Sequence, residues 1–298
     1  MQNILSRIKS GEILLSDGAM GTMLMSKGLK SGNCPETFNL DNPELLKEIA
    51  QTYLDAGADL IQTNTFGASP LKLADYGLEN KTEEINRNAV FAVKQIVEGK
   101  AYVNASVGPS GKMIYPLGEL TEDQLYESYF RQVTALIDSG SDIISIETMS
   151  DILEAVLAVK AAKEIKNDIP VIASMTFEKT KRGYYSIMGV TIAKAAEELK
   201  NAGADIIGSN CGYGIMDMID IAKEFRKCSD LPLIIQSNAG LPEVKKGNLI
   251  FPESEEFMSS HIKELIDSGV SIIGGCCGTT PEYISAFRKE LDLITAVK

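Results

Sequence analysis

The sequence predicts an α/β fold, a single (β/α)8 TIM barrel, and three observations lead to this prediction. Short β-branched runs alternate eight times with longer segments of helical periodicity, a pattern typical of parallel strands joined by helices. A Gly-containing joint recurs before four of the runs. No Gly-x-Gly-x-x-Gly motif follows the first run, as it would in a doubly wound dinucleotide-binding sheet. The barrel is therefore favoured over the open sheet, its main rival.

Each element is assigned from its periodicity. The expected strands are residues 13–16, 60–63, 102–106, 143–146, 171–175, 206–209, 233–236 and 272–275. The expected helices are residues 43–56, 83–98, 122–139, 151–166, 191–202, 216–228, 254–268 and 281–290. No boundary interrupts this pattern, so we expect one domain over residues 1–298. The Gly- and Pro-rich stretches 108–120 and 238–252 follow strands and are expected to be long loops at the catalytic mouth, although plain surface loops fit equally well.

The repeated joint is an internal repeat of the sequence. It reads Asp55-Ala56-Gly57-Ala58-Asp59 at its first occurrence, and related versions end the predicted helices near residues 140, 203 and 269. A glycine accepts the left-handed backbone conformation at low cost, so a helix can end there and turn straight into a buried strand. Four such joints fit a closed barrel of repeated units.

Composition narrows the function. The net charge of −12 argues against nucleic acids and anionic membranes as partners, because both reward clustered Lys and Arg. No apolar run is long enough for a membrane helix or a signal peptide, so we expect a cytoplasmic protein. The only histidine, His261, is expected on the exposed side of a helix, which leaves little room for a His-based triad or a two-His metal site.

Polar residues gather at the expected carboxyl ends of the strands, where barrel enzymes carry their active sites. Cys211 follows one strand, and Cys276 and Cys277 follow another between glycines. Zn²⁺ prefers soft sulfur ligands in tetrahedral geometry, and a catalytic zinc keeps one position open. We therefore expect these three thiolates to hold one Zn²⁺. The alternatives are a buried, inert Cys211 with a vicinal disulfide or an unreactive core pair at 276–277. Cys34 and Cys228 are expected to be structural.

Several motifs together resemble the homocysteine S-methyltransferase family. They are Leu15-Ser16-Asp17-Gly18-Ala19-Met20-Gly21-Thr22, Gln62-Thr63-Asn64-Thr65-Phe66, Glu147-Thr148, Ser209-Asn210-Cys211-Gly212 and Gly274-Gly275-Cys276-Cys277-Gly278-Thr279. The resemblance runs from about residue 10 to residue 290, and the two Cys motifs are its most specific part. The segment 108–120 is more similar to the cobalamin-dependent branch, that of the homocysteine-binding domain of methionine synthases, than to the betaine branch.

The resemblance implies a catalytic zinc on Cys211, Cys276 and Cys277, with homocysteine thiolate as its fourth ligand. It places Asn238 near the metal and implies that Asp17 and Glu147 bind the amino acid part of the substrate. By residue type alone, Asp17 also fits a turn or a helix cap, whereas an acid such as Glu147 at the end of an apolar strand is costly without a partner.

The remaining substrate contacts are expected from the other strand ends. Backbone N–H groups of Gly18–Gly21, with Gly18 and Ala19 as the main binding residues, would cradle the substrate carboxylate, as glycine-rich turns do for anions. Polar side chains at the other strand ends would complete the pocket, namely those of Thr63, Asn64, Ser106, Thr148 and Asn210.

The methyl donor is expected to be methylcobalamin or another methylcorrinoid. The Asp-x-His-x-x-Gly motif of cobalamin-binding modules is missing here, so a separate corrinoid protein or domain would hold the donor. A second hypothesis uses S-methylmethionine or betaine, although the aromatic cage that binds a quaternary ammonium is best built with Trp, which this chain lacks. A third is a non-catalytic zinc- or thiol-binding protein, such as a zinc carrier or a redox sensor.

Overall fold

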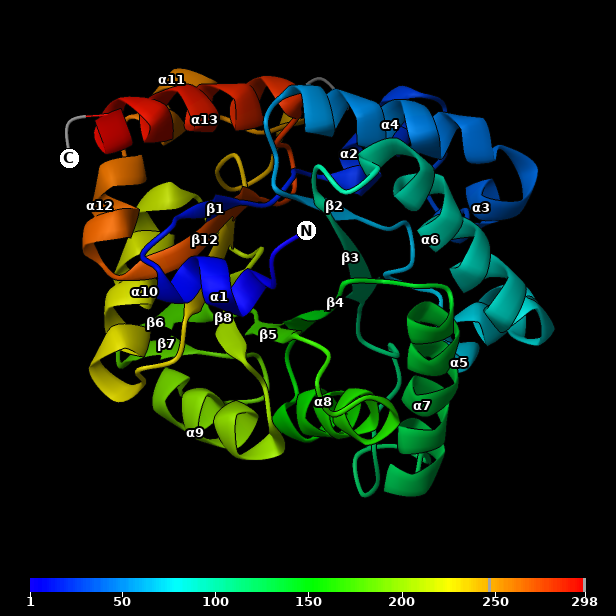
Figure 1. Ribbon diagram of the computed structural model, residues 1–298. Helices are drawn as coiled ribbons and strands as arrows, with labels where there is room; N and C mark the ends of the chain where they lie inside the picture. Colours follow the sequence, from blue (N-terminus) through cyan, green and yellow to red (C-terminus); the bar gives the residue numbers. More distant parts are fainter. Residues whose placement is uncertain (246–247, 297–298) are drawn as a thin grey trace.

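Eight parallel strands form the centre of the molecule in a computed structural model that describes residues 1–245 and 248–296 (Figure 1). In spatial order they are β1 (Leu14–Leu15), β12 (Val270–Gly275), β9 (Leu233–Ser237), β8 (Ile206–Asn210), β5 (Val171–Met175), β4 (Ile143–Met149), β3 (Tyr102–Val107) and β2 (Leu60–Gln62). A parallel bridge between Ser16 and Leu60 joins the first strand to the last. The predicted barrel is therefore confirmed.

Helices surround the strands, and most of them match the predicted ones. They are α4 (Pro43–Asp55), α6 (Thr82–Val97), α7 (Glu122–Asp138), α8 (Ile152–Ile165), α9 (Ile192–Ala202), α10 (Ile215–Cys228), α12 (Ile262–Asp267) and α13 (Pro281–Ala296). The four glycines of the repeated joint all have positive φ, between 84° at Gly269 and 105° at Gly203. They end helices immediately before strands, as the repeat predicts.

The prediction of one helix over residues 254–268 is wrong. The structure has two short helices there, α11 (Glu255–Ser259) and α12, separated at Ser260 and His261. The side chains of both residues contact the carbonyl oxygen of Phe257, at 2.7 Å from Ser260 Oγ and 2.8 Å from His261 Nδ1. Side-chain groups that bond to the local backbone compete with the continuous helical ladder.

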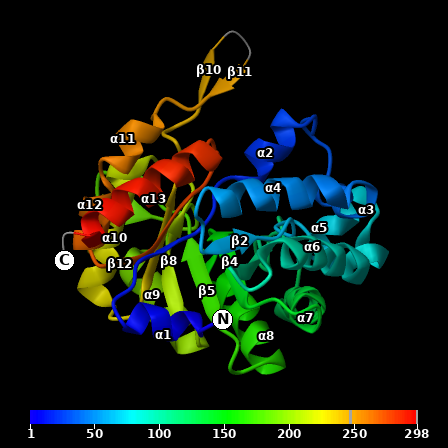
Figure 2. The same ribbon diagram turned by 45° about the horizontal axis from the view of Figure 1, so that its top comes forward.

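Several elements at the two ends of the barrel were not predicted. Hairpins follow two strands: β6 (Glu178–Thr180) with β7 (Gly183–Tyr185) after β5, and β10 (Glu243–Lys245) with β11 (Asn248–Ile250) after β9. The second hairpin occupies the expected loop 238–252 and stands at the end of the barrel opposite α1 (Ile4–Lys9) (Figure 2). The short helices α2 (Met20–Ser26), α3 (Phe38–Asp41) and α5 (Pro70–Leu73) follow β1 and β2.

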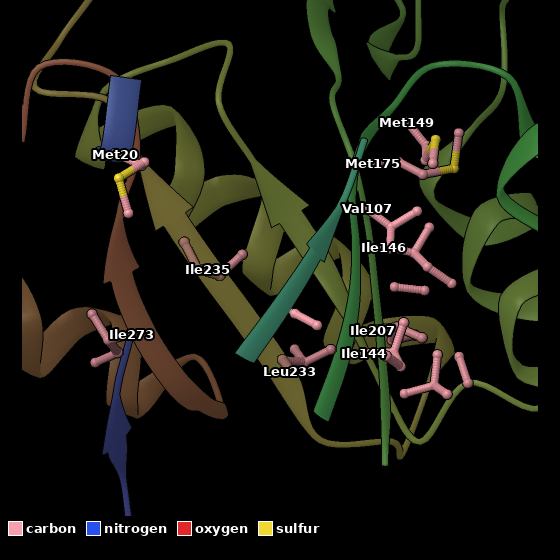
Figure 3. Close-up of a cluster of buried hydrophobic side chains, with 14 of the residues drawn as sticks. Met20, Val107, Ile144, Ile146, Met149, Met175, Ile207, Leu233, Ile235 and Ile273 are labelled. Atoms are coloured by element: carbon pink, nitrogen blue, oxygen red, sulfur yellow. The ribbon is translucent and has the colours of Figure 1, made fainter. Parts of the chain in front are cut away.

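Two apolar layers stabilise the barrel. The outer layer lies between the strands and the helices, and Figure 3 shows Val107, Ile146 and Met175 as members of it. The inner layer fills the amino-terminal end of the barrel with one buried side chain from each strand, and Ile4 of α1 closes it from below. Its strand members are Leu14, Leu60, Tyr102, Ile143, Ile172, Ile206, Ile234 and Ile272.

The inward-facing residues change from apolar to polar or glycine two positions further along each strand. Because side chains alternate between the faces of a strand, the residues two positions on face the barrel interior again. They are Ser16, Gln62, Asn104, Ser145, Ser174, Gly208, Gln236 and Gly274, all polar or glycine. Barrel interiors are normally filled by bulky branched residues. The apolar inner layer therefore ends below this level, and polar side chains and glycines line the interior toward the carboxyl end of the barrel.

The outer surface carries no membrane-spanning element among the described residues, since none of the helices there combines the length and the apolar character needed to cross a bilayer.

We predict that Gly208→Ala lowers the free energy of unfolding by about 3 kcal/mol, the upper end for overpacked cores. A Cβ at this position would lie 1.8 Å from the carbonyl oxygen of Ile234, so β8 and β9 would have to separate. Gly21→Ala is the matched control, since nothing lies within 4 Å of its Cβ position. Urea unfolding of both variants checks this, and equal stabilities would contradict the close approach of the two strands.

Candidate functional site

Three cysteine sulfurs meet at the carboxyl end of the barrel. The Sγ atoms of Cys211, Cys276 and Cys277 all lie within 4.8 Å of one another, and those of Cys211 and Cys277 are 3.9 Å apart. Sulfurs around a tetrahedral zinc, with Zn–S bonds of about 2.3 Å, are separated by about 3.8 Å, whereas a disulfide needs about 2.05 Å. All three cysteines are free and at least partly exposed to solvent. The spacing fits a metal ion and does not fit a disulfide or an inert core pair.

The backbone brings these sulfurs together through two turns on either side of β9. Cys211 has a φ of +64°, the left-handed region that a residue with a side chain rarely adopts. Its N–H donates to the carbonyl of Gln236, and the N–H of Cys276 donates to that of Ser237. Both cysteine turns are thus bonded to successive residues of the same strand, which sets their relative height.

Hydrogen bonds among the three thiol groups shift their pKa values in opposite directions. Thiol donors from Cys276 and Cys277 hold the pKa of Cys211 well below its ordinary value, while the pKa of Cys276 is well above it. The Asn238 side chain also bonds to Cys211, and its Oδ1 atom is buried without a hydrogen-bond partner. Three sulfurs with an orphaned amide oxygen beside them form a donor set suited to a soft cation such as Zn²⁺.

A cavity of about 330 Å³ opens beside the sulfurs. Its wall combines the three cysteines with residues from the ends of β1, β2, β3 and β4. Of the predicted substrate-binding residues it includes Gly18, Ala19, Thr63, Asn64, Ser106, Glu147 and Thr148. The volume is at the small end for ligand sites, which suits a molecule of amino acid size.

Glu147 is the buried carboxylate of this cavity. Its Oε1 atom accepts a hydrogen bond from Gln62 Nε2 at 2.6 Å and another from Ser106 Oγ. Burial nevertheless dominates and raises its pKa to about 7. An acid held in this way gains from a cationic partner, because an ammonium group would compensate its lost solvation.

Asp17 lies behind the cavity wall and is not among the residues that line it. Its Oδ2 atom accepts the N–H of Gln62 at 2.7 Å, and its side chain is 1% exposed. Burial raises its pKa to about 7, and the charge of Glu147 adds to the effect. Asp17 therefore reaches the cavity through Gln62, whose backbone it holds and whose side chain contacts Glu147.

The other predicted residues divide into lining and supporting groups. The Asn64 amide is occupied by bonds to the Pro35 carbonyl and Asn39, and the Thr63 hydroxyl by a contact with Thr65. Asn210 and Asn238 do not line the cavity. Asn210 bonds instead to Thr148, Ser174 and Cys276 from behind.

Some residues of the site were missed by the sequence prediction. Gln62, which donates to Glu147, also lines the cavity, as do Gln236, Met20, Phe66 and Phe251. Alternation could have found Gln62 and Gln236, because each lies two residues beyond an inward-facing apolar residue. The contribution of Phe251 depends on the β10–β11 hairpin, for which the sequence carried no strand signal.

The remaining cysteines and the histidine lie outside the cavity. Cys34 is buried and bonds to Glu36, and Cys228 is the exposed last residue of α10. His261 lies between α11 and α12 with its ring 4.7 Å from that of Phe257, rather than on the exposed side of a continuous helix.

Comparison with known proteins identifies the family. A family model described as homocysteine S-methyltransferase matches residues 14–291. The chain belongs to the homocysteine S-methyltransferase family. The match spans all eight strands and both cysteine turns. The predicted family resemblance is thus confirmed.

Two curated relatives of this family member are methionine synthases from Mycobacterium leprae and Mycobacterium tuberculosis. Each is 30% identical, over 91% and 93% of this chain respectively. The chain spans only 24% of the length of each relative.

Solved structures of the homocysteine methyltransferase MmuM from Escherichia coli share the fold. The metallated form has a TM-score of 0.81 and the apo form 0.75, each at 22% identity. Both matches cover 97% of this chain, with 99% of the metallated form and 98% of the apo form. These likenesses support the barrel architecture of the family.

We predict that the metal-free protein loses stability as pH rises from about 4.5 to about 7. Over this range the folded state keeps the proton of Glu147, whose pKa is about 7, while the unfolded state has released it. The unfolding free energy then falls by at most about 1.4 kcal/mol per pH unit for this group. Glu147→Gln should reduce the slope in urea unfolding and leave the part that the raised pKa of Asp17 contributes.

Glu282→Gln provides the control for this experiment. Hydrogen bonding to Thr280 lowers the pKa of Glu282, so its titration lies below the same pH range. A variant Glu147→Gln with the same pH dependence as the control would show that the buried carboxyl does not titrate as described.

Proposed function

We propose that this chain is a zinc-dependent methyltransferase that activates homocysteine as a thiolate and methylates it to give methionine. The observation that carries the proposal is the convergence of three cysteine sulfurs beside a cavity of amino acid size with a buried carboxylate in its wall. A zinc carrier or a redox sensor needs no such cavity, so this feature favours an enzyme over the non-catalytic alternative.

The three cysteines would hold the zinc and leave one corner open toward the cavity. A free thiol has a pKa of about 8.5, so few homocysteine molecules are nucleophilic at neutral pH. Bound zinc supplies the missing activation, because it displaces the thiol proton and keeps the sulfur as a thiolate. Three cysteine thiolates also make the site anionic, which leaves electron density on the substrate sulfur for attack on a methyl group.

The cavity wall would orient the amino acid part of homocysteine. Glu147 is placed to bind the ammonium group, with Gln62 and Ser106 holding its carboxylate in position. Asp17 would support this arrangement through the backbone of Gln62. Such positioning converts an encounter in solution into an aligned reaction within one site.

The segment from Gly18 onward would receive the substrate carboxylate. The Ala19 N–H is occupied by the carbonyl of Thr279, so the first-turn N–H groups of α2 remain for the anion. A side chain at Gly18 would lie 2.9 Å from both Thr279 and the Tyr53 hydroxyl, which requires glycine there.

The methyl donor proposed is methylcobalamin or a related methylcorrinoid carried by a separate protein or domain. The sulfur lone pair would form the new S–CH₃ bond, the Co–C bonding pair would stay on cobalt, and the thiol proton would pass to solvent. The methionine synthase relatives support this donor. In each of them, about three times the length of the matched segment lies outside it, which leaves room for a further domain.

The mouth of the barrel also suits a large donor. Exposed apolar side chains surround it on the loops that leave the carboxyl ends of β1, β3, β5 and β9. They include Met25, Met113, Tyr115, Leu117, Ile187, Leu241 and Val244, of which Tyr115 is 77% exposed. Exposed apolar residues gathered around one opening are typical of a surface that meets another macromolecule.

Small methylated donors are the second candidate. The aromatic residues that line the described cavity are Phe66 and Phe251, with neither Trp nor Tyr among the lining residues. A quaternary ammonium or sulfonium group is best held by an aromatic cage, so this cavity favours the corrinoid over betaine or S-methylmethionine.

We predict that Cys211→Ala and Cys277→Ala abolish the binding of about one zinc ion per chain and reduce methyl transfer to background, because two thiolates cannot complete the site. Cys228→Ala, at an exposed position outside the site, should keep both. Metal analysis and a methionine assay check this. Full zinc content in Cys211→Ala would contradict the proposed ligand set.

We predict that free methylcobalamin supports methionine formation from homocysteine, whereas betaine does not. The comparison uses wild-type protein with methylcobalamin, S-methylmethionine and betaine in parallel, and quantifies methionine for each. Transfer from S-methylmethionine or betaine alone would replace the corrinoid proposal with the small-donor one.

A further inference from the structure

The side chain of Asn210 joins the cysteine cluster to the end of β4. Its Oδ1 atom accepts the N–H of Thr148 and the hydroxyl of Ser174, both at 2.7 Å. Its Nδ2 atom donates to Thr148 Oγ1 at 2.7 Å and toward Cys276 Sγ at 3.9 Å. The side chain is 1% exposed, so these contacts take up its whole hydrogen-bonding capacity in a buried position.

The orientation of this amide follows from its partners. A backbone N–H can only donate, so the amide atom facing Thr148 N must be the oxygen. The NH₂ group then faces the sulfur of Cys276 and the hydroxyl of Thr148. The network therefore requires an N–H donor, and not a carbonyl oxygen, beside the sulfur.

The same amide lies between two residues with left-handed backbone. Thr148 has a φ of +59° and Cys211 a φ of +64°, and Glu98 is the only other described residue besides glycine with a positive φ. Thr148 follows Glu147 directly, and Cys211 follows Asn210 directly. Strained backbone persists where surrounding bonds over-determine it, and here two strained turns share one side chain.

We propose that Asn210 is a positioning residue that couples the metal-binding sulfurs to the substrate acid. Its N–H group moderates the negative charge on the Cys276 sulfur, and its bonds to Thr148 hold the turn that presents Glu147 to the cavity. The inference rests on the proposed zinc site. Hydrogen bonds to metal-bound ligands tune their electron density, and loss of such partners typically costs about 10- to 100-fold in metal affinity or activity.

The test replaces zinc with Co²⁺, whose thiolate-to-cobalt charge-transfer bands report electron density on sulfur. Asn210→Asp keeps the bonds with Thr148 and Ser174 but places a negative oxygen beside Cys276. Asn210→Ala removes the whole network. Ser174→Ala is the matched control, since it removes one bond to the same Oδ1 atom and leaves the donor to sulfur in place.

We expect the charge-transfer bands to move to lower energy in Asn210→Ala and further in Asn210→Asp, and to stay unchanged in Ser174→Ala. The KM for homocysteine should rise about tenfold in Asn210→Ala, where the Thr148 turn loses its bonds, and change little in Asn210→Asp. A residue that served only the fold would lower thermal stability without moving the bands.

Two results would overturn the inference in distinguishable ways. Wild-type protein could bind Co²⁺ with thiolate bands while both Asn210 variants show the same bands. In that case Asn210 has no effect on the sulfurs, so the proposed coupling is refuted while the proposed metal site stands. If wild-type protein gives no thiolate bands with Co²⁺, the proposed metal site fails as well.

Discussion

The site depends on how two strand ends are held on either side of β9. The parallel register places Asn210 opposite Gln236 and Gly275 opposite Ser237, so the two cysteine turns leave the sheet at nearly the same height. Two strands separated by a third lie about 9.6 Å apart, whereas Cys211 and Cys277 have sulfurs 3.9 Å apart. The turns close this gap, which explains why one of them contains a cysteine with left-handed backbone.

Several acidic groups lie close together in this part of the barrel, and burial shifts their pKa values. Glu147 and Asp17 are buried acids with raised pKa values, and hydrogen bonds from its neighbours lower the pKa of Cys211 in the cysteine cluster beside them. Groups of like charge in a poorly solvated site repel one another, and a dication together with a substrate ammonium would relieve this repulsion. The site is thus organised around charges that its ligands would bring.

The barrel separates stability from chemistry along its axis. Apolar side chains from all eight strands and Ile4 fill the amino-terminal end, while polar residues and glycines occupy the next level. The apolar end needs no hydrogen-bond partners, so it tolerates complete burial. The buried polar side chains of Asn104 and Gln236 belong to the next level, and Gln236 lines the cavity.

The sequence by itself determined the eightfold alternation, the glycine joints and the residues that supply the sulfurs, because these depend on local periodicity and residue chemistry. It did not predict the hairpins after β5 and β9 or the break at His261, where local side-chain bonds outweigh helical periodicity. Only the tertiary structure decided that Asp17 lies behind Gln62 and that Asn210 faces Cys276 rather than the cavity. These roles depend on strand register and on turns with unusual φ, which bring together residues far apart in the chain.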